Sequence, residues 1–246
     1  MLSQKKLNDN NFHKLLIIDI ETVPLYRDFE QLEIPYREQW KHKMSRHLEH
    51  PDDERLLADS FRERAGIFAE FGKIICIGLG YFENSEYTAV RLKHFSGDDE
   101  KRLLEDFFQL LRKTEQQAEI RFCGHNIKEF DLAYICRRAT IHGLSLPVCL
   151  QLTHFKPWQH PHIDTLELWR FGDYKHYITL ELLALCLGVP TSKSDISGKD
   201  VAGVYYGEGD LKRIAEYCLR DVFTTALVYL RLSRIPYTTV NAIFVD

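Results

Sequence analysis

The chain lacks any apolar run long enough to cross a membrane. Its 246 residues are 45% hydrophobic and 28% charged, which is usual for a globular protein that buries a sizeable core. The longest apolar stretches, such as Ile74 to Tyr81, fall far short of the ~20 residues of a membrane helix. We find no secretory signal, and residues 1–13 are polar enough to predict a disordered tail. We therefore expect one domain over residues 14–246 and no membrane association.

Paired cysteines are also lacking. The six cysteines are scattered among mostly apolar neighbours, and none forms a Cys-x-x-Cys pair (Cys76, Cys123, Cys136, Cys149, Cys186 and Cys218). This pattern is typical of buried free thiols in a reducing compartment, so a cytoplasmic location is expected. His154, His160 and His162 lie close together in sequence, but prolines interrupt them and no cysteine is nearby. Their spacing matches no compact zinc pattern.

An excess of positive charge is absent. Lysine and arginine number 32 against 36 aspartates and glutamates, a net charge of −4. Proteins that bind nucleic acid strongly and without specificity are usually basic, because neutralising phosphates supplies most of their affinity. The net charge therefore excludes a strong nonspecific nucleic-acid-binding protein. We expect only weak, short-range contact with the end of a strand.

What the sequence does contain is a set of acids in informative settings. Asp19 and Glu21 end the apolar run that begins at Leu15, a pattern that predicts a buried strand. Side chains two apart on a strand project from the same face, so these carboxylates point into one site. A surface position at the strand end is the alternative, but a charged pair directly after buried aliphatics favours a functional role.

Three further residues complete the set. Asp131 follows a predicted strand-to-helix junction at residues 124–130 and lies beyond the position of a simple helix cap. Tyr217 and Asp221 are four apart in a predicted helix, which places them on one helix face. Four carboxylates gathered together raise one another's pKa and require cations. Hard oxygen ligands favour Mg²⁺ or Mn²⁺, and two such ions recur in phosphodiester cleavage.

The order Asp-x-Glu, Asn-x-x-x-Phe-Asp and Tyr-x-x-x-Asp resembles the DEDDy branch of the DEDD 3′→5′ exonucleases. In particular it is similar to the proofreading-exonuclease domain of family B DNA polymerases in a stand-alone form. The likeness covers roughly residues 14–232. Its later half includes Ile163-Asp164-Thr165-Leu166 and Tyr217-Cys218-Leu219-Arg220-Asp221. Neither Glu216 nor Tyr217 is a histidine, which excludes the branch with a His-x-x-x-x-Asp motif.

The resemblance assigns roles to these side chains. It implies that Asp19, Glu21, Asp131 and Asp221 hold two ions, with Asp19 bridging both. A tyrosine is a poor general base at neutral pH, so Tyr217 is expected to orient the attacking water. Packing alone is the alternative role for Tyr217.

Substrate contacts and supporting residues follow from the same resemblance. Thr22 and Val23 are expected to contact the 3′-terminal nucleotide. Asn126 and Phe130 match the middle motif, with Phe130 either stacking beside that nucleotide or packing in the core. Asp164 is expected to support the site rather than to bind metal. Four further residues are candidates for phosphate contacts, or else solvated loop side chains: Lys175, His176, Lys193 and Lys199.

The order of elements predicts an α/β fold with a mixed sheet and helices on both faces. Strands at residues 74–81 and 87–95 are expected to form an antiparallel hairpin. We expect a strand at residues 120–124 and helices at residues 98–112, 129–142, 180–187 and 210–234, with a polar loop at residues 191–209. Residues 24–72 predict a helical insertion after the first strand. This is the ribonuclease-H-like architecture that the resemblance also implies.

The combined prediction is a metal-dependent 3′→5′ exonuclease that releases nucleoside monophosphates from single-stranded ends. DNA is favoured over RNA as the substrate, and no nucleotide cofactor is expected. The same chemistry on RNA is one alternative, since no residue is seen to read the 2′-hydroxyl. A non-catalytic nucleic-acid-binding module is the other, and the complete set of acids counts against it.

Overall fold

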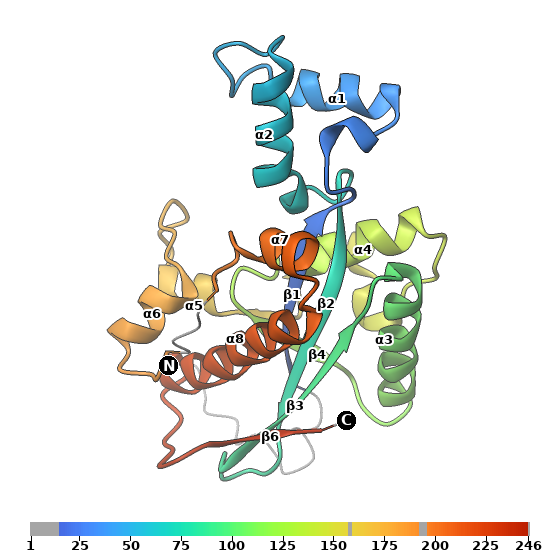
Figure 1. Cartoon of the computed structure of the whole chain (residues 1–246). Helices are drawn as coiled ribbons and strands as arrows, with labels where there is room; N and C mark the ends of the chain where they lie inside the picture. The colour runs from blue at the N-terminus through green and yellow to red at the C-terminus, as the bar shows by residue number, and fades with distance from the viewer. Residues whose placement is uncertain (1–14, 157–158, 192–195, 246) are drawn as a thin grey trace.

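A mixed β-sheet with helices on both faces forms the body of the protein (Figure 1). The computed structural model describes residues 15–156, 159–191 and 196–245, so the predicted tail at residues 1–13 and Lys193 lie outside it. The six strands are ordered β5-β4-β1-β2-β3-β6. Their bounds are β1 Leu15–Pro24, β2 Gly72–Phe82, β3 Ala89–Ser96, β4 Arg121–Gly124, β5 Ile163–Asp164 and β6 Asn241–Phe244.

The first three strands form an antiparallel meander, with β2 and β3 making the predicted hairpin. β4 pairs with β1 in parallel, β5 with β4, and β6 with β3. The expected ribonuclease-H-like mixed sheet is therefore confirmed. The added edge strand β6 was not predicted, because its four residues carry little alternation of apolar and polar side chains.

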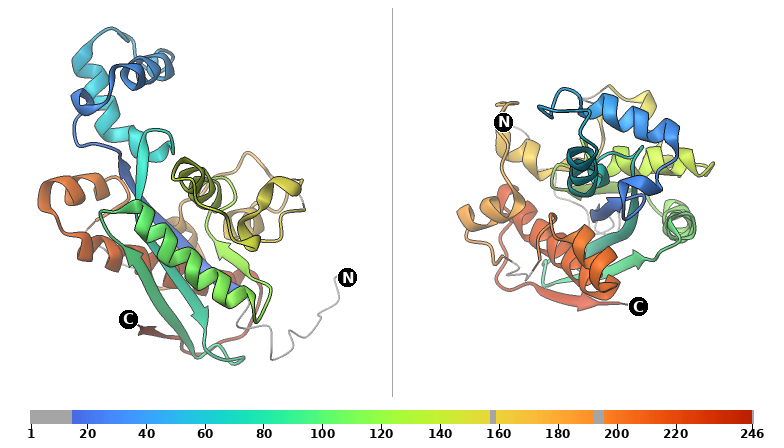
Figure 2. Two further views of the ribbon diagram at one scale, coloured as in Figure 1. Left: turned by 90° about the vertical axis from the view of Figure 1, so that its right-hand side faces the viewer. Right: turned by 45° about the horizontal axis from the view of Figure 1, so that its top comes forward.

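Both faces of the sheet are covered by helices. The helices are α1 Ile34–Met44, α2 Glu54–Arg64, α3 Glu100–Glu115, α4 Asp131–Ile141, α5 Thr165–Arg170, α6 Leu180–Cys186, α7 Val201–Gly203 and α8 Leu211–Leu232. One face packs against α3 and α4, and Figure 2 shows α3 lying along the strands there. The other face packs against α8. Among the described residues, no helix combines the length and apolar character that a bilayer span requires.

Strand alternation in β1 decides which side chains meet which helix. Ile18 and Ile20 point to the face covered by α3 and α4. Ile17 and Val23 point to the face covered by α8. Asp19 and Glu21 share the parity of Ile17 and Val23, so the strand directs both carboxylates toward α8.

The helical insertion lies between β1 and β2 and projects from the end of the sheet where β1 finishes (Figure 1). It has a small core of its own in which Trp40 and Phe61 are fully buried. Two hydrogen bonds connect it to α4: Tyr134 Oη donates to the Gly66 carbonyl at 2.8 Å, and Arg138 Nη1 donates to the Ala69 carbonyl at 2.9 Å. The insertion is thus fixed beside the sheet end that carries the acids.

The predicted loop at residues 191–209 is partly helical instead. It contains α7 and a π-helical turn at Val204–Glu208. The Tyr205 hydroxyl donates to Asp98 at 2.7 Å and accepts from Lys73 Nζ at 2.9 Å. The Tyr206 hydroxyl donates to the carbonyl of Pro24 at 2.6 Å. These partners are distant in sequence, so local composition could not reveal the turn.

Candidate active site

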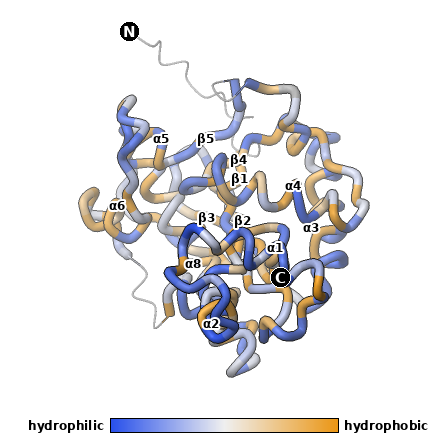
Figure 3. Tube along the Cα trace, turned by 90° about the horizontal axis from the view of Figure 1, so that it is seen from above, coloured by the Kyte–Doolittle hydropathy of each residue, from blue (hydrophilic) through white to orange (hydrophobic). Residues whose placement is uncertain are grey.

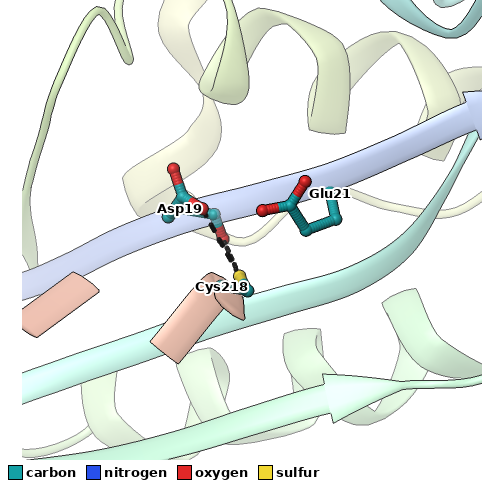
Figure 4. A group of neighbouring side chains, drawn as sticks. All are labelled: Asp19, Glu21 and Cys218. Carbon is teal, nitrogen blue, oxygen red and sulfur yellow. Dashed lines mark hydrogen bonds between the residues drawn. The ribbon is translucent and has the colours of Figure 1, made fainter. Parts of the chain in front are cut away.

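The two acids of β1 lie under α8, as Figure 4 shows. Asp19 pairs in register with Gly78 of β2. A Cβ atom added at Gly78 would lie 2.8 Å from the Cys218 Sγ atom of α8. Glycine at this position therefore lets the helix approach the strand closely. This close approach brings the residues of α8 to Asp19 and Glu21.

Cys218 is a neighbour of the acids that the sequence did not reveal. Its thiol lies 3.4 Å from Asp19 Oδ2 and 3.5 Å from the Asp19 carbonyl oxygen. Ligand atoms of Asp19, Glu21 and Cys218 all lie within 4.8 Å of one another. The sequence feature that could have indicated this contact is that Cys218 lies three residues before Asp221, and therefore on the same side of the helix.

Asp131 reaches the same region from α4. β4 pairs with β1 only over residues 15–17, so this edge of β1 is open beyond Ile17. The backbone N–H of Ile20 at the open edge donates to Asp131 Oδ1 at 3.1 Å. Asp131 therefore replaces the missing strand partner and is held beside Asp19.

Tyr217 and Asp221 come from α8, as their spacing predicted. The Tyr217 phenol hydrogen-bonds the Asp221 carboxylate. Burial, followed by the charges of Asp221, Glu21 and Asp19, raises the pKa of Tyr217 above its ordinary value. The phenol is therefore neutral at physiological pH and can donate a hydrogen bond.

The acids perturb one another strongly. Burial and the charges of Asp131 and Asp221 raise the pKa of Asp19 well above its usual range. Burial and Asp19 do the same to the pKa of Glu21. Burial raises the pKa of Asp131 to about 7. Each shift means that the ionised cluster is unfavourable as it stands, which is the electrostatic condition of a cation site.

Thr22 and Val23 follow the acids across an irregularity in the β1–β2 register after Glu21. The Thr22 hydroxyl hydrogen-bonds that of Tyr134 on α4, so it faces away from α8. Val23 is fully buried, with its side chain in the cluster around Ile75 and Val201. Any contact of Val23 with a ligand would use its backbone.

Asn126 and Phe130 lie in the turn that leads into α4. Asn126 has a left-handed backbone with φ of 63°, a conformation that asparagine tolerates better than most residues. Among the described residues its buried Oδ1 has no hydrogen-bond partner. The partly buried Phe130 ring lies 5.3 Å from that of Tyr134. Phe130 directly precedes Asp131, and Asn126 lies five residues before it.

Asp164 supports this turn, as expected. Its carboxylate accepts the backbone N–H groups of Asn126 at 2.8 Å, Lys128 at 3.1 Å and Leu166 at 2.9 Å. Lys175, His176 and Lys199 are exposed. Their role in phosphate contact stays a prediction.

Among the described residues, the histidines are in no group that could hold a metal ion. Phe122 N–H donates to His162 Nδ1 at 3.1 Å, and His162 Nε2 lies 3.0 Å from the carbonyl of Cys149. Both ring nitrogens are therefore engaged with backbone, and the ring must be neutral to accept at Nδ1. The side chain of His154 lies outside the described residues.

The neutral, buried His162 ring predicts that the folded protein loses stability in acid. Burial, followed by His160, lowers the pKa of His162 to about 4. Because the folded pKa is below the unfolded value near 6.5, the stabilisation is present above pH ~6.5 and is lost as pH falls through ~4. We expect the wild type to lose up to about 3 kcal/mol in this window. Urea unfolding of wild type and His162→Gln across this window measures the difference. The exposed His176→Gln control should follow the wild type, and equal slopes in all three would contradict the prediction.

Comparison with known proteins agrees with this geometry. Residues 67–241 match a family described as predicted 3′-5′ exonucleases related to the exonuclease domain of PolB. A solved family B DNA polymerase from the hyperthermophilic archaeon Pyrobaculum calidifontis shares the fold, with a TM-score of 0.56 and 16% identity. That match covers 88% of this chain and 24% of the polymerase.

Two curated DNA polymerases are similar in sequence. The one from Thermococcus aggregans is 23% identical over 175 residues, covering 63% of this chain and 9% of the polymerase. The one from Thermococcus litoralis is 22% identical over 175 residues, covering 63% of this chain and 10% of the polymerase. The chain thus spans a small part of these relatives. The family match begins after Asp19 and Glu21 and includes Asp131, Tyr217 and Asp221. As the motifs predicted, the chain belongs to the family of predicted 3′–5′ exonucleases related to the exonuclease domain of PolB.

Proposed function

We propose that this protein is a metal-dependent 3′→5′ exonuclease acting on single-stranded DNA. The observation that carries the proposal is the close group of Asp19 and Glu21, with ligand atoms within 4.8 Å of each other, on which the charges of Asp131 and Asp221 act. Asp19 and Glu21 come from β1, Asp131 from the start of α4, and Tyr217 and Asp221 from α8. Their charges act on one another, as the pKa shifts record.

The donor set fits hard divalent cations. Carboxylate oxygens suit Mg²⁺ or Mn²⁺, and Asp19, Glu21, Asp131 and Asp221 would hold two ions. When bound, such ions lower the pKa of a water and stabilise the leaving 3′ oxygen. Burial and, after it, mutual repulsion raise the pKa values of Asp19 and Glu21, and a bound cation would favour the ionised carboxylates against both effects.

The chain's own residues supply position and hydrogen bonds. The neutral Tyr217 phenol, fixed against Asp221, is placed to orient the attacking water. Asn126 Oδ1 has no hydrogen-bond partner among the described residues, so it is an acceptor suited to the terminal nucleotide. Phe130 offers a ring beside it, while Thr22 and the Val23 backbone border the acids.

A polarity assay tests the proposal. A 5′-labelled single strand should shorten stepwise from its 3′ end in Mg²⁺ or Mn²⁺, with nucleoside monophosphates as products. Chelation should abolish the reaction, because the ionised cluster then has no counter-charge. Matched RNA in a parallel reaction decides the sugar preference. Circular or 3′-blocked DNA is the control, and degradation of either at the same rate would refute the exonuclease assignment.

A further inference from the structure

A groove of about 1010 Å³ lies outside the acid site. It runs between α4, the segment at residues 146–155 and the segment that joins α5 to α6. Its floor and walls are largely apolar, with Ala133, Leu150 and Leu152 among them. Three positive residues line it as well, Lys128, Arg137 and Arg170, together with the acids Glu129 and Glu167. Lys128 pairs with Glu167 and Arg170 with Glu129, whereas the exposed Arg137 has no ion pair among the described residues. The mixture of apolar surface and cations suits a ligand with flat apolar faces and negative charge.

Exposed aromatic side chains stand on the segment between α5 and α6. Phe171 is 83% exposed and Tyr174 is 80% exposed. Phe171 also has a left-handed backbone with φ of 46°, which is unfavourable for a bulky residue. Figure 1 shows this segment rising on the same end of the molecule as the helical insertion. Large rings displayed to solvent at a conformational cost indicate a binding surface.

A buried arginine holds this segment in place. Arg170 is 7% exposed, and its Nε donates to the carbonyl of His176 at 2.9 Å. Its guanidinium lies 4.3 Å from the centre of the Tyr177 ring, and its Nη1 donates to Glu129 at 3.2 Å. The Tyr177 hydroxyl donates to the same carboxylate at 2.8 Å. The aromatic rings are therefore presented by an anchored segment.

The same arginine retains donor capacity. Its Nη2 has no hydrogen-bond partner among the described residues, although the side chain lines the groove. His160 also lines the groove, and within that part of the chain its buried Nδ1 has no partner either. Buried polar atoms without partners are uncommon in folded proteins. Both atoms belong to residues that line the groove, but each atom is itself buried, so they add polarity to its wall rather than an exposed contact.

The groove adjoins the turn that leads to Asp131. Lys128 and Glu129 line it and directly precede Phe130 and Asp131. The Asp164 carboxylate binds the N–H groups of Asn126 and Lys128 and caps α5, so the groove and the acids share one rigid support. Seen from above, α4 and α5 flank β4 next to β1 (Figure 3). The groove therefore lies beside the element that carries Asp131.

We propose that this groove binds the nucleotides that precede the 3′ end of a single strand, by stacking a base on Tyr174, which lines it, with Phe171 exposed on the same segment. The inference rests on the proposed nuclease function and adds the path of the strand. Aromatic platforms tolerate any base, because every base has a flat face. The groove's cations contact the backbone, so a net charge of −4 for the whole chain does not prevent binding.

The test compares wild type with Tyr174→Ala, Tyr174→Trp and the matched control Phe244→Ala, whose ring is 64% exposed on β6. Fluorescence anisotropy in EDTA measures the affinity for labelled single strands of about three and about twelve nucleotides. The absence of metal prevents turnover, so the measurement is independent of hydrolysis. Melting temperatures check that all variants are folded.

Tyr174→Ala should weaken binding of the longer strand about tenfold and leave the shorter strand unchanged, because only the longer one reaches the ring. Tyr174→Trp should bind like wild type or better, and Phe244→Ala like wild type. Equal affinity of wild type and Tyr174→Ala for the longer strand would overturn the proposal and assign the groove to another partner. Normal length dependence without turnover in Mg²⁺ would support the groove and refute the nuclease function alone.

Discussion

Asp19→Ala should lower the turnover of a single-stranded substrate by roughly 10³-fold or more. Burial and the charges of Asp131 and Asp221 raise the pKa of Asp19, and Asp19 Oδ2 lies 3.4 Å from the Cys218 thiol. Removing it takes away the carboxylate expected to be shared by both ions. Single-turnover kinetics in saturating Mn²⁺ measures the chemical step. Asp106→Ala, at an exposed position on α3, is the control and should keep full activity.

The same variant should be at least as stable as the wild type without metal. The folded pKa of Asp19 is raised, so the ionised carboxylate opposes folding above its unfolded pKa. Removal of Asp19 also takes away a negative charge that raises the pKa of Glu21. Urea unfolding in EDTA near pH 8 checks this. Near-native activity would remove Asp19 from the mechanism, and a large loss of stability would show that the carboxylate has a structural partner.

The acids could be located from sequence because strand and helix periodicity are local properties. The alternation of side chains along β1 indicated that Asp19 and Glu21 point the same way. The interval of four residues indicated that Tyr217 and Asp221 lie on one face of a helix. The helical interval also placed Cys218 near Asp221, but no local signal showed that Gly78 would admit its thiol to Asp19. That contact depends on how closely α8 packs on the sheet.

The remaining differences have a similar origin. The π-helical turn depends on Lys73, Asp98 and Pro24, all more than 100 residues before it in sequence. The aromatic segment was identifiable as Phe171, Tyr174 and Tyr177 at intervals of three residues. The exposure of these rings could not be predicted from sequence, because it follows from the way Arg170 and Glu129 anchor the segment. Sequence therefore predicted the family and the fold, but not the contacts between distant segments that surround the acids.

Tyr217→Phe should slow the reaction by about 10²–10³-fold and leave metal binding nearly unchanged. The substitution keeps the ring that packs beside Ala215 and Cys218 and removes only the hydroxyl that bonds Asp221. All four carboxylates remain, so the affinity for cations is preserved. In the proposed mechanism the neutral phenol holds the water in position, so its loss should lower the rate.

Asp221→Ala should differ from Tyr217→Phe, because impaired metal binding should be its primary defect. Calorimetric titration of Mn²⁺ into wild type and both variants separates the two roles when turnover is measured in parallel. Tyr237→Phe, beyond the end of α8, is the matched tyrosine control and should behave as the wild type in both measurements. If Tyr217→Phe turns over normally, the phenol is a packing residue only, and water must be oriented by the carboxylates instead. If Tyr217→Phe loses metal affinity as Asp221→Ala does, its hydroxyl acts by fixing the Asp221 carboxylate, because that hydrogen bond is the contact it makes with the acid set.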